Sequence, residues 1–365
     1  MSSFDVVRNL GLKAARRLRA APKPIVRMMR RQAREEEHRA FRREAEEIDA
    51  TIAGLARGRA PIIVGPWLGE VGYEVLYWIP FLRWFQDAHG IPSDRFVVVS
   101  RGGMEIAYAG IAGRYVDLFD LTTPKDLAAR NRQRRADAEG GGQKQSASSA
   151  LDNELLADVR TRLGLSDARV CHPSLMFRLF REVWHGNLPM DLLWRRTRYE
   201  RTRLPSSLSL AVPNDFVAVK LYSGPALSMN DRTRETLRQL VARAAAVAPV
   251  VLLDVDLGID EHRDLELEDL PNVTSARSLM TARTNLGVQL ELVTRSRFFL
   301  SACGGLAWLS PFLGVPTVAV YDNDHLLAPH LFVARQAGKL TGAAEFSALD
   351  LRSVARLGLE GVPSR

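Results

Sequence analysis

The stretch SACGGLAWLSPFLGVPTVAVY, residues 301–321, decides the fold, because it holds a strand end, a glycine turn, a helix and another strand in immediate succession. The apolar run at 298–300 that leads into it is typical of a buried strand. Residues 306–313 are apolar enough for a buried helix that Gly314 would end, and a proline opens a second buried strand at 317–321. The order of these segments predicts a β-α-β unit.

The glycine pair Gly304–Gly305 inside this unit has two interpretations. Glycines allow a sharp turn and a close approach of a ligand to the backbone. Free N–H groups and the helix dipole at such a turn would form a ready phosphate site. The same glycines can instead serve only the packing of an ordinary β-α-β unit. A lone glycine pair does not distinguish the two, so the rest of the chain has to decide.

Length and composition limit the class of protein. A chain of 365 residues predicts about two domains, and 46% hydrophobic residues suffice for large cores. Cys171 and Cys303 are too few and too far apart for a disulfide scaffold or a zinc cluster, which fits a reducing compartment. The start has no apolar core of a secretory signal, and no run of 18 apolar residues follows. We therefore expect neither secretion nor a membrane-spanning helix.

The net charge of +8 is concentrated at the N-terminus. Residues 1–34 contain ten lysines and arginines against one acid and carry +9, whereas the remaining 331 residues carry −1. Apolar residues recur in this segment at helical spacing, opposite the arginines: Phe4, Val7, Leu10, Ala14 and Leu18. A basic amphipathic helix of this kind predicts attachment to an anionic membrane surface.

Two other interpretations of the basic segment remain. It lacks aromatic residues between its arginines for base stacking, which disfavours nucleic acid as a partner. It can also be a solvated tail. Pro22 and Pro24 would end the first helix, and a second, charge-mixed helix is predicted over about 25–55.

Beyond this extension, short apolar runs alternate with helical patterns, which predicts open parallel sheets. We predict an α/β fold of two Rossmann-like, doubly wound domains facing a cleft. The predicted domains are a basic helical extension at 1–58, an N-terminal domain at 59–208 with a mobile loop at about 130–150, and a C-terminal domain at 209–365. The predicted strands are 62–64, 95–100, 115–118, 216–221, 250–255, a short one around 273, 298–300 and 317–321. The predicted helices are 73–85, 104–112, 153–163, 174–184, 232–246 and 286–294. Such halves normally leave a ligand cleft at the carboxyl ends of their strands.

Several common catalytic motifs are missing. The chain has no G-x-x-x-x-G-K-[ST] loop and no G-x-G-x-x-G after a strand, which disfavours kinases, ATPases and dehydrogenases. It has no G-x-S-x-G elbow and no H-E-x-x-H pair, which disfavours serine hydrolases and zinc proteases.

Three segments follow one another in the C-terminal half: FVAVKLYSG (216–224), VVLLDVDLGIDEH (250–262) and 285–321, which ends in the opening stretch. In this order they resemble the donor half of GT-B fold glycosyltransferases. The element GPWLGEVGYEVLYW (65–78) is similar to the first strand and helix of heptosyltransferases, where an acid precedes a helical proline by six positions. Glu74 and Pro80 match that spacing, although Tyr73 stands where those proteins have glycine.

The resemblance implies a bacterial cell-envelope type of glycosyltransferase that moves a sugar from a nucleotide-diphosphate sugar to a lipid-linked or cell-envelope glycan. It also implies direct displacement with inversion and no metal or other cofactor. Together with the basic segment it predicts a cytoplasmic enzyme, peripheral on the inner membrane face. The expected donor-binding residues are Lys220, Tyr222, Ser223, Gly224, Asp254, Asp256, Asn285, Gly304, Gly305 and Asp322.

Two carboxylates are candidates for the base that takes a proton from the acceptor hydroxyl. Glu74 fits the proline spacing, and Glu70 follows a glycine as the family pattern requires. Either can instead be an acid that favours the first turn of a helix. The candidates for the acceptor side, several of which also suit the core, are Trp67, Gly69, Gly72, Tyr73, Gly102 and His172.

Two other functions share this fold. A catalytically inactive protein could bind nucleotide sugars and act as a scaffold for partner enzymes through its basic segment. A nucleotide-sugar epimerase would share the donor site but need no membrane-binding segment. Transfer or hydrolysis of a donor distinguishes these from a glycosyltransferase.

Overall fold

The computed structural model describes residues 23–137, 145–202, 204, 210–255, 257, 262–325 and 327–356. The chain divides into two compact units, 1–51 and 52–365. Helix α2 (Lys23–Ala56) confirms the charge-mixed helix predicted at 25–55. The basic helix predicted for the first residues lies outside the described part up to residue 22. Among the described residues, no helix has the length and apolarity that crossing a membrane requires.

The first sheet of the second unit contains four parallel strands in the order β3-β2-β1-β4. These are β1 (Ile62–Val64), β2 (Phe96–Ser100), β3 (Arg114–Asp117) and β4 (Arg169–Cys171). Every residue of β1 and β2 is buried, as expected for strands covered on both faces. Strand β4 was not predicted, because its three residues include an exposed arginine and make no apolar run.

The helix after β1 contains a π-helical segment. It runs as α3 (Val71–Tyr73), η1 (Glu74–Trp78) and α4 (Ile79–His89). Pro80 has no N–H to give to the carbonyl of Leu76, which lies four residues earlier. The hydroxyl of Tyr199 donates to that carbonyl instead, at 2.9 Å. A proline inside a helix is thus accommodated by a wider turn and a side-chain donor.

Two predictions for the remaining segments of the first half are wrong. The helix predicted at 104–112 is a 3-10 helix, η3 (Met104–Tyr108). The loop predicted to begin at 130 begins later, because α5 (Pro124–Asp137) continues to Asp137. Its buried face includes the polar residues Asn131 and Arg134, so the apolar helix signal is weak there. Residues 138–144 of that loop lie outside the described part. The other elements are η2 (Ser93–Arg95), η4 (Leu118–Asp120), α6 (Ala150–Leu163), α7 (Ser174–Trp184) and α8 (Asp191–Trp194).

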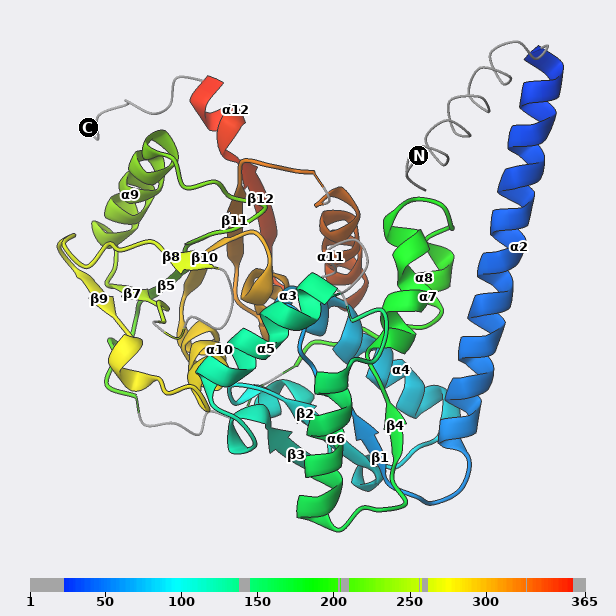
Figure 1. The fold of residues 1–365 in the computed structure, drawn as a ribbon. Coiled ribbons are helices and arrows are strands. Elements are labelled where there is room, and N and C mark those ends of the chain that lie inside the picture. Colours follow the sequence, from blue (N-terminus) through cyan, green and yellow to red (C-terminus); the bar gives the residue numbers. More distant parts are fainter. Residues whose placement is uncertain are drawn as a thin grey trace, which may run out of the picture. The chain divides into compact units, whose positions relative to one another are not determined.

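The second sheet contains six parallel strands in the order β12-β11-β10-β5-β7-β9 (Figure 1). They are β5 (Val217–Lys220), β7 (Val250–Leu252), β9 (Val273–Ser275), β10 (Phe298–Ala302), β11 (Thr317–Tyr321) and β12 (Phe346–Asp350). A small antiparallel pair joins β6 (Tyr222–Ser223) to β8 (Arg263–Asp264). The helical elements are α9 (Asp231–Ala245), η5 (Arg277–Leu279), α10 (Asn285–Arg295), α11 (Ala328–Thr341) and α12 (Leu351–Arg356). Two parallel sheets with helical crossovers confirm the predicted fold class.

The helix predicted at 306–313 is wrong in type. The segment forms two 3-10 helices, η6 (Gly305–Trp308) and η7 (Ser310–Leu313). Pro311 has no N–H for a continuous helix, and the Ser310 hydroxyl lies 2.6 Å from that of Thr317. A dipole of a long helix therefore does not act at Gly304–Gly305, and only the local N–H groups remain for an anion.

The two halves meet at the start of α10. The N–H groups of Leu286 and Gly287 donate to the carbonyl of Gly102, at 2.8 and 3.0 Å. A Cβ on Gly287 would lie 2.8 Å from the carbonyl oxygen of Gly103, so the two backbones need glycine to come this close. The two halves, each of which contains one of the two parallel sheets, lie within the one compact unit 52–365.

Candidate active site

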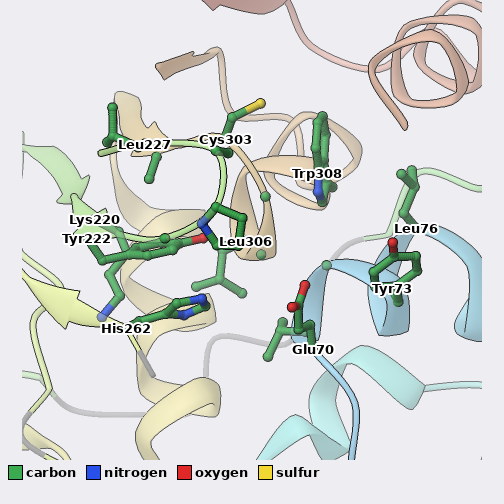
Figure 2. Close-up of a pocket in the computed structure, with 18 of the residues that line it drawn as sticks. Glu70, Tyr73, Leu76, Lys220, Tyr222, Leu227, His262, Cys303, Leu306 and Trp308 are labelled. Atoms are coloured by element: carbon green, nitrogen blue, oxygen red, sulfur yellow. The ribbon is translucent and has the colours of Figure 1, made fainter. Parts of the chain in front are cut away.

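A cleft of about 260 Å³ lies between the two halves of the 52–365 unit (Figure 2). The first half contributes the start of its bulged helix, from Glu70 to Tyr77. The second half contributes the ends of β5 and β10, residues that follow these strands, and residues of α10 and α11. Nine of the residues predicted for the site line this cleft: Glu70, Gly72, Tyr73, Lys220, Tyr222, Gly224, Asn285, Gly304 and Gly305.

The glycine turn after β10 lies in the wall of the cleft. Gly304 has φ 128° and Gly305 has φ 45°, both in the region that favours glycine. A Cβ at Gly304 or Gly305 would be in van der Waals contact with the Tyr222 hydroxyl, at 3.4 and 3.5 Å respectively. From the other half, a Cβ on Gly72 would lie 3.1 Å from the Gly305 nitrogen. The turn itself therefore carries no side chain where the two halves approach each other, and the Tyr222 hydroxyl lies beside it.

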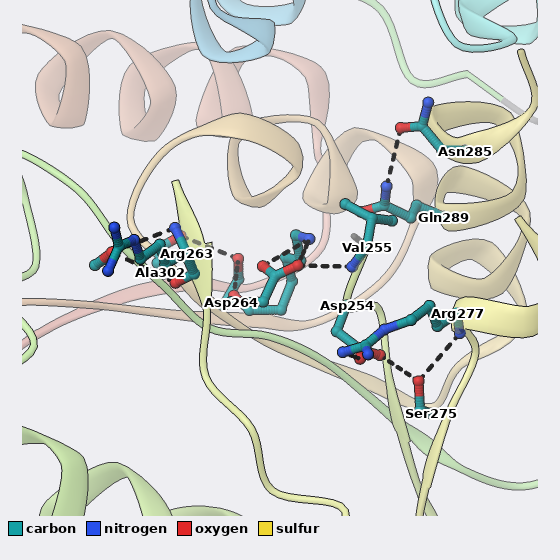
Figure 3. A network of polar contacts seen from close by, with 12 residues as sticks. Asp254, Val255, Arg263, Asp264, Ser275, Arg277, Asn285, Gln289 and Ala302 are labelled. Carbon is teal, nitrogen blue, oxygen red and sulfur yellow. Dashed lines mark hydrogen bonds and ion pairs between the residues drawn. The ribbon is translucent and has the colours of Figure 1, made fainter. Parts of the chain in front are cut away.

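Lys220 places an ammonium group in the cleft at the end of β5, as predicted. Its Nζ lies 2.9 Å from Oδ1 and 3.0 Å from Oδ2 of Asp264. The backbone N–H of Val255 donates to Oδ2 at 2.7 Å (Figure 3). The sequence did not indicate this aspartate, because the contact depends on the pairing of β6 with β8.

Tyr222 and His262 form a ring pair on the same side of the cleft. Their ring centroids lie 4.5 Å apart with an interplanar angle of 32°. Both side chains line the cleft, and Figure 2 shows them close to Lys220. Aromatic faces of this kind accept the flat surface of a base or a sugar ring.

The two candidate bases occupy different environments. Glu70 precedes α3 with extended backbone angles, φ −70° and ψ 144°, and its carboxylate points into the cleft (Figure 2). Glu74 lies in the core of the first half with no exposed surface, and it does not line the cleft. Of the two candidates, Glu70 is therefore the one that lines the cleft.

Glu74 has a structural environment of its own. The hydroxyls of Ser100 and Tyr108 donate to its Oε1 at 2.5 and 2.6 Å, whereas the buried Oε2 has no hydrogen-bond partner among the residues that the structure describes. Burial raises the pKa of Glu74 to about 7, against the opposing effect of these hydrogen bonds and of the nearby Arg101 charge.

His330 joins the two halves at another end of the cleft. Its Nε2 lies 3.2 Å from the Tyr73 hydroxyl and its Nδ1 lies 2.5 Å from the Tyr77 hydroxyl. A neutral imidazole has one N–H donor and one acceptor nitrogen, so both nitrogens are satisfied. Burial is the largest cause that raises the pKa of each of these tyrosines, so both remain protonated at neutral pH.

Three residues predicted for the donor side serve the structure around the cleft. Asp254 accepts from the Ser275 hydroxyl and the Arg277 guanidinium, both at 2.6 Å, and does not line the cleft (Figure 3). Asp322 accepts from the Ser228 backbone N–H at 3.0 Å and so anchors the loop that begins at Gly224. Ser223 is hydrogen-bonded to the backbone of β8. Asp256 lies outside the described residues.

Four residues predicted for the acceptor side also lie outside the lining. Trp67 is buried in a stack with Trp78 and Phe177, and Gly69 packs against its ring. The Nδ1 of His172 accepts from the Ser174 N–H, and its Nε2 lies 3.2 Å from Oδ1 of Asp152. These two contacts of His172 fix the start of α7. Gly102 receives the start of α10, as described above. These positions stabilise the fold that shapes the cleft.

Several lining residues were not singled out by the sequence: His262, Asp264, Gln289, Cys303, Trp308 and His330. Four of them, His262, Gln289, Cys303 and Trp308, lie inside the segments 250–262 and 285–321 that carried the family resemblance, and this was the signal available for them. Burial raises the pKa of Cys303 to about 12, so it remains a thiol and does not act as a nucleophile at neutral pH. Among the described residues, no group of three or more His, Cys, Asp or Glu could hold a metal ion.

Comparison with known proteins gives similarity at the level of the fold. No protein-family model matches the chain, and no curated protein matches it in sequence. Among solved structures, E. coli heptosyltransferase WaaC with ADP is 15% identical over 82% of this chain and 99% of its own, with a TM-score of 0.41. E. coli ADP-heptose lps heptosyltransferase II is 14% identical over 82% and 98%, with a TM-score of 0.40. The glycosyl transferase family 9 structure from Veillonella parvula is 10% identical over 84% and 90%, with a TM-score of 0.44.

Heptosyltransferases and a family 9 glycosyltransferase are thus among the proteins that this chain resembles, as its sequence motifs predicted. A fold hosts many activities, so the chemistry of the cleft has to follow from its own residues.

Proposed function

We propose that this protein is a glycosyltransferase that moves a sugar from a nucleotide-sugar donor to a hydroxyl group of an acceptor. The observation that carries the proposal is the placement of Glu70 across one cleft from Lys220 and the bare Gly304–Gly305 turn. A carboxylate on one wall and phosphate-binding groups on the other are what a displacement at a sugar carbon requires.

Each of these groups has a role in the proposed reaction. Glu70 takes the proton of the attacking hydroxyl. Lys220 and the N–H groups of the Gly304–Gly305 turn stabilise the negative charge of the departing phosphate. The Tyr222–His262 ring pair offers a flat apolar surface to the donor. A single displacement inverts the configuration of the sugar carbon, and the proposal assigns no step to a metal or another cofactor.

The acceptor and location form a finer part of the proposal. We propose a lipid-linked or cell-envelope glycan as acceptor, with residues 1–34 attached to the anionic inner face of the membrane. The charge of +9 in these residues supports this, because basic segments near anionic lipid gain about 1 kcal/mol per charge. Sedimentation with vesicles that contain phosphatidylglycerol should bring down the full chain. Replacing Arg16, Arg17 and Arg19 by Glu should leave it in the supernatant.

The test of the activity starts from a panel of nucleotide sugars that includes ADP-heptose. A donor that binds raises the melting temperature by mass action, and turnover releases its nucleotide. Glu70→Gln should keep the thermal shift and lower the release of nucleotide by about 100-fold or more. Glu74→Gln is the matched control, since it changes a carboxylate one helical turn away that does not line the cleft.

The outcomes separate the competing functions. If no nucleotide sugar shifts the melting temperature and none is turned over, the proposed function is wrong. Conversion of the donor sugar with the nucleotide still attached would indicate an epimerase. Binding without turnover, with every acceptor supplied, would indicate a binding or scaffold protein. An unchanged rate in Glu70→Gln would exclude Glu70 as the base.

A further inference from the structure

The charge of the cleft is unusual for a site that receives phosphate. Among the described residues that line it, three are charged at neutral pH: Glu70, Lys220 and Asp264. No arginine is among them, and these described residues together carry −1 when the histidines are neutral. Anion sites more often combine several cationic groups. The one lysine in the described lining also has a carboxylate beside it.

The ion pair of Lys220 and Asp264 is close and largely shielded from water. Both carboxylate oxygens lie within 3.0 Å of Nζ, and the side chains are only 14% and 13% exposed. Charges in such surroundings interact more strongly than charges in bulk water. The carboxylate therefore compensates much of the positive charge that Lys220 would otherwise offer to a ligand.

Asp264 is also fixed in place by its backbone and by a second hydrogen bond. It pairs with Tyr222 in the β6–β8 ladder, and the next residue donates its N–H to the carbonyl of Leu221 at 2.8 Å. Its side chain accepts from the Val255 N–H. A ligand that contacts Lys220 thus meets a carboxylate that stays beside the lysine.

We propose that Asp264 is a specificity-determining residue that limits the negative charge the cleft accepts on a bound phosphate group. The inference rests on the proposed function only in that phosphate enters the cleft beside Lys220. Asp264 repels each negative charge of the ligand, so it weakens the binding of a multiply charged phosphate more than the binding of a singly charged one. It also favours departure of the charged nucleotide after transfer.

The experiment measures the binding affinity of inorganic phosphate and of pyrophosphate by titration calorimetry. These probes can be used without knowing the nucleotide base or the sugar of the donor. Asp264→Asn keeps an oxygen for the Val255 N–H and removes the charge. A unit charge about 6 Å from the ligand changes affinity roughly threefold per ligand charge in bulk water, and more where the charges are shielded from water. Affinity should therefore rise at least roughly tenfold for phosphate and at least roughly thirtyfold for pyrophosphate. Both gains should shrink in 0.5 M salt.

Two controls isolate the ion pair. Asp254→Asn removes another strand-end aspartate that is paired with a basic side chain but does not line the cleft, and it should leave both affinities unchanged. In a Lys220→Gln background, Asp264→Asn should still improve binding, but from a weaker starting affinity. If Asp264→Asn does not fold, Asp264→Ser removes the charge with a smaller side chain that retains an acceptor oxygen.

Equal or weaker binding of pyrophosphate in a folded charge-removed variant would overturn the proposal, as would equal gains for phosphate and pyrophosphate. The result is independent of turnover. A protein that gains pyrophosphate affinity but transfers no sugar would retain this inference and lose the proposed function. An active transferase whose Asp264→Asn variant gains no pyrophosphate affinity would support the proposed function and contradict the inference about Asp264.

Discussion

Glu74→Gln is expected to make the protein's stability less dependent on pH. Glu74 is buried, and burial raises its pKa to about 7, from an ordinary value of 4.5. The glutamine side chain has nearly the same shape, and its carbonyl oxygen can accept from the hydroxyls of Ser100 and Tyr108. It resembles the protonated form of Glu74 and cannot ionise.

The sign and size of this pH effect follow from the linkage between proton binding and folding. A carboxyl whose pKa is raised in the folded state contributes stability below its unfolded pKa and loses it as the pH rises through the folded pKa. With pKa values of 4.5 unfolded and about 7 folded, ionisation of Glu74 lowers the free energy of unfolding between pH 5 and pH 8. The loss is about 2.5 kcal/mol over this range. The glutamine variant has no such loss.

Urea denaturation of both proteins at pH 5, 6, 7 and 8 measures the effect. The free energy of unfolding of the variant minus that of the wild type should rise by about 2.5 kcal/mol across the series, because titrations common to both proteins cancel. A constant offset between the two proteins is compatible with the reasoning, since the amide differs slightly from the acid. A difference that does not change with pH would refute it.

Three other substitutions are tested by urea denaturation, two at contacts between the halves and one within the first half. His330→Ala removes the contacts to two tyrosine hydroxyls and should lower the free energy of unfolding by about 2 kcal/mol. Gly102→Ala should lower the free energy of unfolding by about 3 kcal/mol, which is more than Gly164→Ala should. Both glycines have positive φ, but of the two only Gly102 has a neighbouring atom within 3 Å of an added Cβ. Tyr199→Phe should cost about 1 kcal/mol by leaving the Leu76 carbonyl without its donor. A Gly102→Ala effect no larger than that of Gly164→Ala would contradict the packing at α10.

Strong apolar runs made most of the fold predictable. Strands β1, β2, β10 and β11 are continuous apolar runs between turns, and their order along the chain indicates parallel sheets. Strand β12 has no fully buried residue, so it lacked that signal. The two 3-10 helices at 305–313 have the apolar composition of a helix, and composition does not distinguish one helix type from another.

The site was predictable where it depends on the ends of strands. Lys220 ends one buried strand and Gly304–Gly305 follow another, and parallel strands bring their carboxyl ends to one edge. Glu70 and Glu74 could not be separated from sequence, because residues four apart share a face when both are helical. Glu70 instead has extended angles, which turn its side chain away from that face. His330 and Asp264 depend on contacts between distant segments that no local pattern records.

The carbonyl of Gly102, which accepts from the first N–H groups of α10, has a consequence for dissecting the protein. A fragment that starts near residue 209 would lack this acceptor, and the donors of Leu286 and Gly287 would be left to water. It would also expose the glycine surface against which Gly103 packs. We expect such a fragment to be poorly soluble when it is made alone, and to be recovered when the segment 52–208 is co-expressed with it.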